Sequence, residues 1–364
     1  MIDPAHARAL QLLGRLWVEE LRLEDLPLLA ALPELADSLD RAGSADLTEL
    51  AAEHQRLFGF NLPPYESVFL DPSGMLDAPA TARLRVLYRD AGWAPPAGLR
   101  AAADDHLGLQ LLALADMATG GQEALAKRLL TEHLALWAPL CVAALRRLQP
   151  HPFYQTLGAL SLGLLLNALP DTIVDPQLPE LPPPPRYTGS SDGSGRSTDE
   201  VPAWAVPLAS GGNGHRPGDR PDTGPASGPD NRSDNPDLAA VVDALLLPRS
   251  AGIYITRRDI AAIAHGLGLG APAGERRRML EGLMRGAGGL GLADPALRGL
   301  DALLADEADT LAAWSETWPA WSAVGDLWCG CLTERRKVLA EGFAAGWTAP
   351  ATGRITWRER FTSA

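Results

Sequence analysis

The sequence has few cysteines, few aromatic residues and no apolar run long enough to cross a bilayer. Its three cysteines, Cys141, Cys329 and Cys331, are odd in number and lack a framework spacing, so we expect a reducing compartment. The longest apolar stretch, residues 157–169, is interrupted by two polar residues and is shorter than a membrane-spanning helix. The N-terminus has no basic region followed by an apolar one. We therefore predict a cytoplasmic protein without stable membrane insertion.

The short motifs of common enzyme classes are also missing. The sequence contains no G-x-x-x-x-G-K-[ST] phosphate loop, no H-E-x-x-H, no G-x-S-x-G, and no G-x-G-x-x-G between a strand and a helix. We therefore predict a protein that is not an enzyme and holds no cofactor. Positive charge is in deficit as well, with 45 acidic residues against 32 basic ones and a net charge of −13. Such a surface repels nucleic acid and favours a cationic partner.

Alanine and leucine dominate the composition, and runs of β-branched residues at a spacing of two are almost absent. This pattern predicts an all-α protein. Asp3 and Pro4 form a helix start, with a cap followed by a proline at the first helical position. Residues 122–148 predict one long helix with Pro139 inside it. Because proline has no N–H, the carbonyl of Ala135 is expected to lack a helical partner.

The length of 364 residues and a change in composition along the chain indicate more than one region. We predict a helical domain over residues 1–170 and a helical C-terminal region over 237–348. Between them, the Pro-, Gly- and Ser-rich residues 171–236 predict a disordered linker. Residues 349–364 are a tail. In the C-terminal region, four tryptophans are spaced for one helix face and predict a docking or core face: Trp314, Trp318, Trp321 and Trp328.

Residues 249–286 are locally basic and predict two short helices around a glycine-rich turn. One interpretation is a helix-turn-helix, which makes a DNA-binding regulator the alternative function. The other is an arginine face that docks on the acidic N-terminal domain.

Residues 104–106, Asp-Asp-His, stand directly before the apolar run 107–117. Three interpretations are open: a metal site shared with His133, a catalytic group, or the cap and rim of a helix. Neighbouring helical residues point about 100° apart, so Asp105 and His106 do not easily share one ion. Asp104 or Asp105 suits an N-cap, where a carboxylate accepts from free backbone N–H groups. We therefore favour cap and rim.

Four stretches together resemble the TorD/DmsD family of chaperones that mature molybdenum oxidoreductases. They are PPYESVFLDPSGML (63–76), LRVLYRDAGWAPP (84–96), DDHLGLQLLALA (104–115) and LLTEHLALWAPLCVAALRRLQPHPFYQTL (129–157). The resemblance covers about residues 5–170, and the segment from Pro248 resembles a C-terminal extension of some members. It implies an all-helical cytoplasmic chaperone that binds the twin-arginine leader of a client enzyme. Such a chaperone holds the apoenzyme for molybdopterin cofactor insertion and delays its export.

The family's E-P-x-D-H-I-G motif matches this chain in part. The matching positions are Asp105, His106 and Gly108. The family's Glu and Pro fall on Ala102 and Ala103, and a following acid falls on Gln110. These departures change the charge pattern at the rim without affecting the expected fold.

A twin-arginine leader offers two guanidinium groups and an apolar helix, so its receptor needs carboxylates beside a hydrophobic groove. We expect the arginines to meet Glu66, Asp104, Asp105 and Glu132. We expect the groove to be lined by Tyr65, Phe69, Leu109 and Trp137. The predicted peptide-binding set is completed by His106, Gln110 and His133.

Structural roles remain open for several of these residues: a cap for Asp105, a tie between loop and helix for His106, and core packing for Tyr65, His133 and Trp137. The implied partners are a molybdopterin oxidoreductase catalytic subunit, its leader and molybdenum cofactor biosynthesis proteins, with no metal and no nucleic acid. A metal hydrolase using Asp105, His106 and His133 is a third hypothesis. The segment Thr256-Arg257-Arg258 also resembles the arginine pair of a leader, which raises the idea of an internal mimic.

Overall fold

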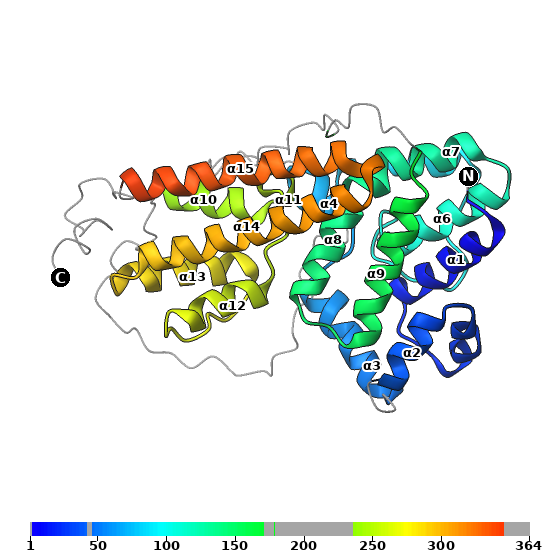
Figure 1. The fold of residues 1–364 in the computed structure, drawn as a ribbon, viewed down its shortest axis with the longest axis horizontal. Helices are drawn as coiled ribbons and strands as arrows, with labels where there is room; N and C mark the ends of the chain where they lie inside the picture. Colours follow the sequence, from blue (N-terminus) through cyan, green and yellow to red (C-terminus); the bar gives the residue numbers. More distant parts are fainter. Residues whose placement is uncertain (1, 42–45, 171–177, 179–235, 346–364) are drawn as a thin grey trace, which may run out of the picture. The chain divides into compact units, whose positions relative to one another are not determined.

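The computed structural model describes residues 2–41, 46–170, 178 and 236–345. These residues form helices and loops without a β-strand among them, which confirms the all-α prediction (Figure 1). The described residues before and after the long gap belong to one compact unit. The predicted linker, apart from Leu178 and Pro236, and the predicted tail lie outside the described residues.

The first half of the chain contributes most of the helices around the site. In chain order they are α1 (Pro4–Val18), the 3-10 helix η1 (Leu23–Ala31), α2 (Pro33–Arg41), α3 (Leu47–His54), the π-helical η2 (Gln55–Asn61), α4 (Glu66–Leu70), α5 (Pro79–Asp90), α6 (Leu107–Thr119), α7 (Glu123–Arg128), the π-helical η3 (Leu129–Leu134), α8 (Ala135–Arg147) and α9 (Pro152–Asn167).

The C-terminal region adds α10 (Pro236–Leu246), α11 (Pro248–Ala251), α12 (Arg257–Gly266), α13 (Arg276–Gly289), α14 (Ala293–Thr317), the short 3-10 helix η5 (Pro319–Trp321) and α15 (Ser322–Ala345). Helices α14 and α15 run side by side (Figure 1).

Helix α1 begins as the sequence predicts. Asp3 Oδ1 accepts from the backbone N–H groups of Ala5 and His6, each at 2.8 Å, and Pro4 is the first helical residue. Its apolar face packs on α6, where two glycines bring the helices together. A Cβ atom on Gly108 would lie 2.3 Å from the carbonyl oxygen of Gly14. This crossing therefore requires the absence of a side chain at Gly108.

The long helix predicted over residues 122–148 is present as the consecutive segments α7, η3 and α8. Pro139 lies inside α8, and the carbonyl of Ala135 accepts instead from the Trp321 indole, with Nε1 at 2.9 Å. Trp328 Nε1 donates to the next carbonyl, that of Leu136, at 2.8 Å. Both indoles are fully buried. Two of the four tryptophans, Trp321 and Trp328, thus dock on the backbone of α8 beside the proline. The prediction of one helix face is wrong, because α14 ends at Thr317 and the tryptophans that follow lie outside it.

A buried ion cluster joins the end of α8 to the C-terminal region. Arg147 forms ion pairs with Glu307 and, at 3.3 Å, with Asp259, and it donates to the Tyr254 carbonyl at 2.8 Å. Burial raises the pKa of Glu307 to about 7, although Arg147 acts in the opposite direction. The acids Asp259 and Asp306 add to the increase.

One stretch of the described chain, Glu123–Arg147, is long and apolar enough to cross a membrane. Buried core helices meet the same criterion, and 83% of its apolar window is buried inside the fold. Its role in the structure is to supply the surface on which Trp321 and Trp328 dock.

Replacing Gly108 by alanine should destabilise the fold by roughly 1–3 kcal/mol, because the new methyl group meets backbone rather than a flexible side chain. Gly163 in α9 is the matched control, since a Cβ atom there meets nothing within 4 Å. Gly163→Ala should stabilise by about 0.5–1 kcal/mol. Urea unfolding followed by circular dichroism measures both. Equal stabilities for the two variants would contradict the close crossing.

Glu307→Gln should change how stability depends on pH. The folded pKa of Glu307, about 7, lies above the ordinary value of 4.5, so its protonated form is the one that favours folding. That contribution is complete below about pH 4.5 and disappears as the pH rises to about 7. The wild type should therefore lose up to about 3 kcal/mol relative to Glu307→Gln between pH 4.5 and 7.5. Denaturant unfolding at several pH values tests this, and a constant difference would refute it.

Candidate functional site

Two helix N-termini meet at the predicted site. Residues Tyr65 and His106 form an isolated antiparallel bridge. The Glu66 N–H donates to the Asp105 carbonyl at 3.1 Å, and the Leu107 N–H donates to the Pro64 carbonyl at 2.8 Å. These two bonds place the first turn of α4 beside the first turn of α6.

The caps at this junction differ from the prediction. The residue that caps α6 is His106, whose Nδ1 accepts from the Gly108 N–H at 3.0 Å. Asp105 instead caps α4, because its Oδ2 accepts from the Ser67 N–H at 2.7 Å. The prediction that Asp104 or Asp105 caps α6 is therefore corrected, since the backbone bridge directs the Asp105 carboxylate to the neighbouring helix.

Burial shifts the pKa of both capping groups. It raises the pKa of Asp105, while the hydrogen bond from the Ser67 N–H lowers it. It lowers the pKa of His106 to about 3, helped by the nearby His54. A neutral imidazole leaves Nδ1 free to accept a hydrogen bond, which is what the cap of α6 requires.

A buried carboxylate, Glu66, lies at the centre of the site. Its side chain is 0% exposed and accepts hydrogen bonds or ion pairs from three other helices. His133 Nδ1 lies 2.9 Å from Oε1, Arg83 Nη2 lies 3.2 Å from Oε1, and Gln110 Nε2 lies 3.1 Å from Oε2. The charge of Glu66 is therefore fully satisfied within the protein.

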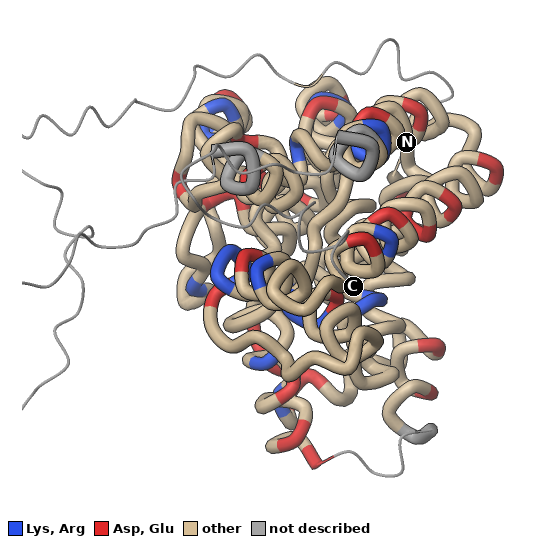
Figure 2. Tube along the Cα trace, turned by 90° about the vertical axis from the view of Figure 1, so that its left-hand side faces the viewer, with Lys and Arg blue, Asp and Glu red and all other residues tan. Residues whose placement is uncertain are grey.

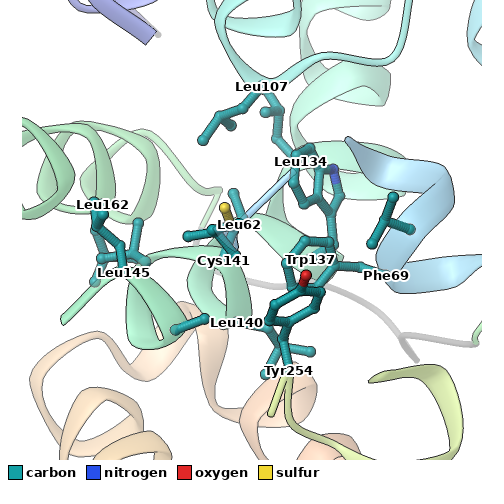
Figure 3. Packing of buried hydrophobic residues seen from close by; sticks show 14 of the residues in the cluster. Leu62, Phe69, Leu107, Leu134, Trp137, Leu140, Cys141, Leu145, Leu162 and Tyr254 are labelled. Carbon is teal, nitrogen blue, oxygen red and sulfur yellow. The ribbon is translucent and has the colours of Figure 1, made fainter. Parts of the chain in front are cut away.

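Phe69 and Trp137, predicted to line an open groove, are fully buried. Their ring centroids are 5.3 Å apart, and Tyr254 from the C-terminal region packs on Phe69 at 5.4 Å. Figure 3 shows the three rings together, beside Leu140 and Leu134. Leu109 is also buried, at 3% exposure. Here the C-terminal region covers the wall that the sequence suggested was open.

Three predicted site residues reach the surface. Tyr65 is half-buried, accepts from the Ala102 N–H at 3.1 Å and packs edge-on against His106. Asp104 is 38% exposed and Glu132 is 51% exposed. Glu132 pairs with Arg128 one turn earlier on the same helix, at 3.4 Å.

Sequence reasoning missed the residues that hold Asp104. Arg85, on α5, places Nε 2.5 Å from an Asp104 oxygen and Nη2 2.6 Å from an Asp77 oxygen. Asp77 lies in the turn before α5 with φ 55°, a conformation that Asp and Asn accept more readily than most residues. The sequence gives no signal for this pairing, because it connects positions 8 and 19 residues apart through loops. Exposed apolar side chains adjoin these residues in the chain: Met75, Leu76 and Val86.

A separate pocket of about 370 Å³ lies away from these residues. It is lined by Ile2, Leu114, Ala118, Glu123, Ala126, Lys127, Leu130, Asn167, Ala168, Leu169 and Pro170. None of the predicted peptide-binding residues contributes to it.

The structure also describes the residues of the alternative predictions: the metal site, the basic segment and the arginine pair. Within the described ranges, no group of three or more His, Cys, Asp or Glu side chains is placed to hold a metal ion. In the basic segment, Arg276 stacks on Tyr254 at 3.9 Å, while Arg277 and Arg285 pair with Glu281. Acidic and basic positions are spread over many helices (Figure 2). The pair Arg257 and Arg258 lies in the first turn of α12, where Arg258 bonds to Gln149 at the end of α8.

Comparison with known proteins gives two matches. Residues 23–143 match the family model described as nitrate reductase delta subunit. The chain is also similar to the Tat proofreading chaperone DmsD of Salmonella typhi, with 34% identity over 111 residues. That alignment covers 29% of this chain and 54% of the relative, so the chain spans about half the length of the curated relative it matches.

His106→Asn should remove a pH dependence while keeping the cap, because the Asn side-chain oxygen also accepts from the Gly108 N–H. The folded pKa of His106 is about 3, below the ordinary 6.5, so its contribution to stability is present above pH 6.5 and falls as the pH decreases. Between pH 6.5 and 5 the wild type should lose about 2 kcal/mol relative to the variant. Chemical denaturation across this range measures it, and parallel stability curves would contradict the neutral imidazole.

Proposed function

We propose, from the premise that this chain belongs to the TorD/DmsD family of chaperones, that it binds the twin-arginine leader of a redox enzyme and retains that enzyme before export. The premise rests on the match over residues 23–143 and on the similarity to the curated relative. Binding of a leader requires a site for guanidinium groups next to apolar surface.

The observation that carries the proposal is the carboxylate pair Asp77 and Asp104. Both side chains are partly exposed, at 47% and 38%, and both are ion-paired with the guanidinium of Arg85. The spacing of the two carboxylates therefore already suits an arginine. The neighbouring Met75 and Leu76 are 63% and 41% exposed and offer apolar contact to the residues that follow the arginines.

Within the predicted peptide-binding set, we assign contact to the members that reach solvent. These are Tyr65, Asp104 and Glu132. The other members are buried: Glu66, Phe69, Asp105, His106, Leu109, Gln110, His133 and Trp137. Leader binding to them would need a conformational change that breaks the Glu66 network or moves Tyr254.

The finer assignments follow from the family. The client is a molybdopterin oxidoreductase catalytic subunit, held in its apo form in the cytoplasm while cofactor is inserted with the help of molybdenum cofactor biosynthesis proteins. The chaperone itself performs no reaction. A net charge of −13 supports attraction between this chain and a cationic leader.

The test uses the full chain and two fluorescent peptides: a twin-arginine leader, and the same leader with both arginines replaced by lysine. Fluorescence anisotropy should give tighter binding of the arginine peptide, because lysine cannot make bidentate contacts. Asp104→Asn should weaken its binding about tenfold, the loss expected when one charged hydrogen-bond partner is removed.

Asp90→Asn is the matched control, because this substitution removes the same charge from an exposed residue at the end of α5. It should change the affinity much less than Asp104→Asn. Equal effects of the two variants would reject Asp104 as a contact. Equal, weak binding of both peptides to the wild type would reject the function.

A further inference from the structure

We infer that Arg85 competes with the arginines of the leader for the carboxylates of Asp77 and Asp104. It thereby sets how strongly a cationic segment must bind. The inference rests on the proposed function and adds a specificity-determining residue to the same site. It follows from the position of the Arg85 side chain, its exposure and its ion pairs.

Arg85 occupies the guanidinium position of the site. Its Nη2 lies 2.6 Å from Asp77 and its Nε lies 2.5 Å from Asp104, so it bridges both carboxylates. The proximity of Asp104, followed by that of Asp77, raises the pKa of Arg85. A leader arginine that binds to either carboxylate in the same geometry must therefore displace Arg85.

The Arg85 side chain can move away from the site, whereas the carboxylates of Asp77 and Asp104 are held in position. Arg85 is 48% exposed, and a long flexible side chain connects its guanidinium to α5. The two acids are attached more firmly, because Asp77 belongs to a tight turn and the Asp104 carbonyl accepts from the Tyr88 hydroxyl at 3.4 Å. Exposed ion pairs of this kind are weak and open readily.

The pair of Arg83 and Glu66 shows the contrast. Glu66 is 0% exposed, and His133 and Gln110 also donate to it. Removing Arg83 from that carboxylate would not admit a peptide, because the carboxylate remains enclosed. Removal of Arg83 and removal of Arg85 thus have different consequences, because Arg83 pairs with a buried carboxylate and Arg85 with two exposed ones.

Competition by Arg85 lowers the affinity of the site for every ligand by the same factor. That factor depends only on the internal pair, so it is the same for an arginine leader and for a lysine leader. If the pair stabilises the closed state by about 1 kcal/mol, the factor is about five. Weakly cationic segments then remain unbound, while a good leader still binds.

The experiment measures the dissociation constants of the arginine leader and the lysine leader for the full chain carrying Arg85→Gln. Both peptides should bind about fivefold more tightly than to the wild type, with their affinity ratio unchanged. Arg89→Gln is the matched control, because this substitution removes the same charge one turn later on α5. Arg89 is exposed and makes no ion pair with a described residue. It should change both affinities less than twofold.

Two results overturn the inference: an effect of Arg85→Gln equal to that of Arg89→Gln, or weaker binding in Arg85→Gln, which would make Arg85 a contact. Arg85→Lys provides a second variant that keeps the charge, and it should give an intermediate gain. Failure of the wild type to prefer the arginine leader would overturn the proposed function instead, so the two failures are distinguishable. Thermal unfolding of each variant confirms that the fold is retained.

Discussion

The site depends on a buried carboxylate that receives all its hydrogen bonds from within the protein. Glu66 stands in the first turn of α4, and its partners come from α5, α6 and η3. An unpaired charge in this position would be very costly, so the donors on these helices constrain how the helices pack. A neutral amide at position 110 suits this arrangement. The Gln110 amide donates to Glu66, whereas a carboxylate there would face a second carboxylate.

The C-terminal region is held by backbone groups that the first half of the chain leaves available. Pro139 withdraws a helical donor from Ala135, and the Trp321 indole supplies the replacement. The Arg147 cluster ties the far end of α8 to the same region. Covering Phe69 is a consequence of this docking, because Arg147 donates to the Tyr254 carbonyl and the Tyr254 ring packs on Phe69. The aromatic wall is therefore closed, while the side chain of Asp104 stays partly exposed.

Local features were predictable from the sequence, and pairings between distant residues were not. The cap at Asp3 and the free carbonyl at Ala135 follow from capping and proline chemistry. Helical spacing failed for the tryptophans, because Trp314, Trp321 and Trp328 lie on three different elements. A cap was predicted at Asp104 or Asp105, but the cap of α4 by Asp105 and that of α6 by His106 needed the bridge to Tyr65. The rim prediction is wrong for both residues, because both are buried. The burial of Phe69 and Trp137 could not be predicted, because the covering residue, Tyr254, is more than 100 positions away. The ion pairs of Arg85 connect loops whose paths carry no periodic signal.

Stability and recognition thus use the same residue type in two ways. A buried arginine such as Arg147 is fixed, because leaving would strand Glu307 and Asp259 without their cation. Arg85 carries the same group, yet water replaces its contacts at little cost because all three members of its cluster are exposed. A chain with an excess of acids attracts many cations, and most of them are not leaders. In the proposed function, an exposed internal arginine would raise the affinity that any of them must reach, without any change in the buried framework.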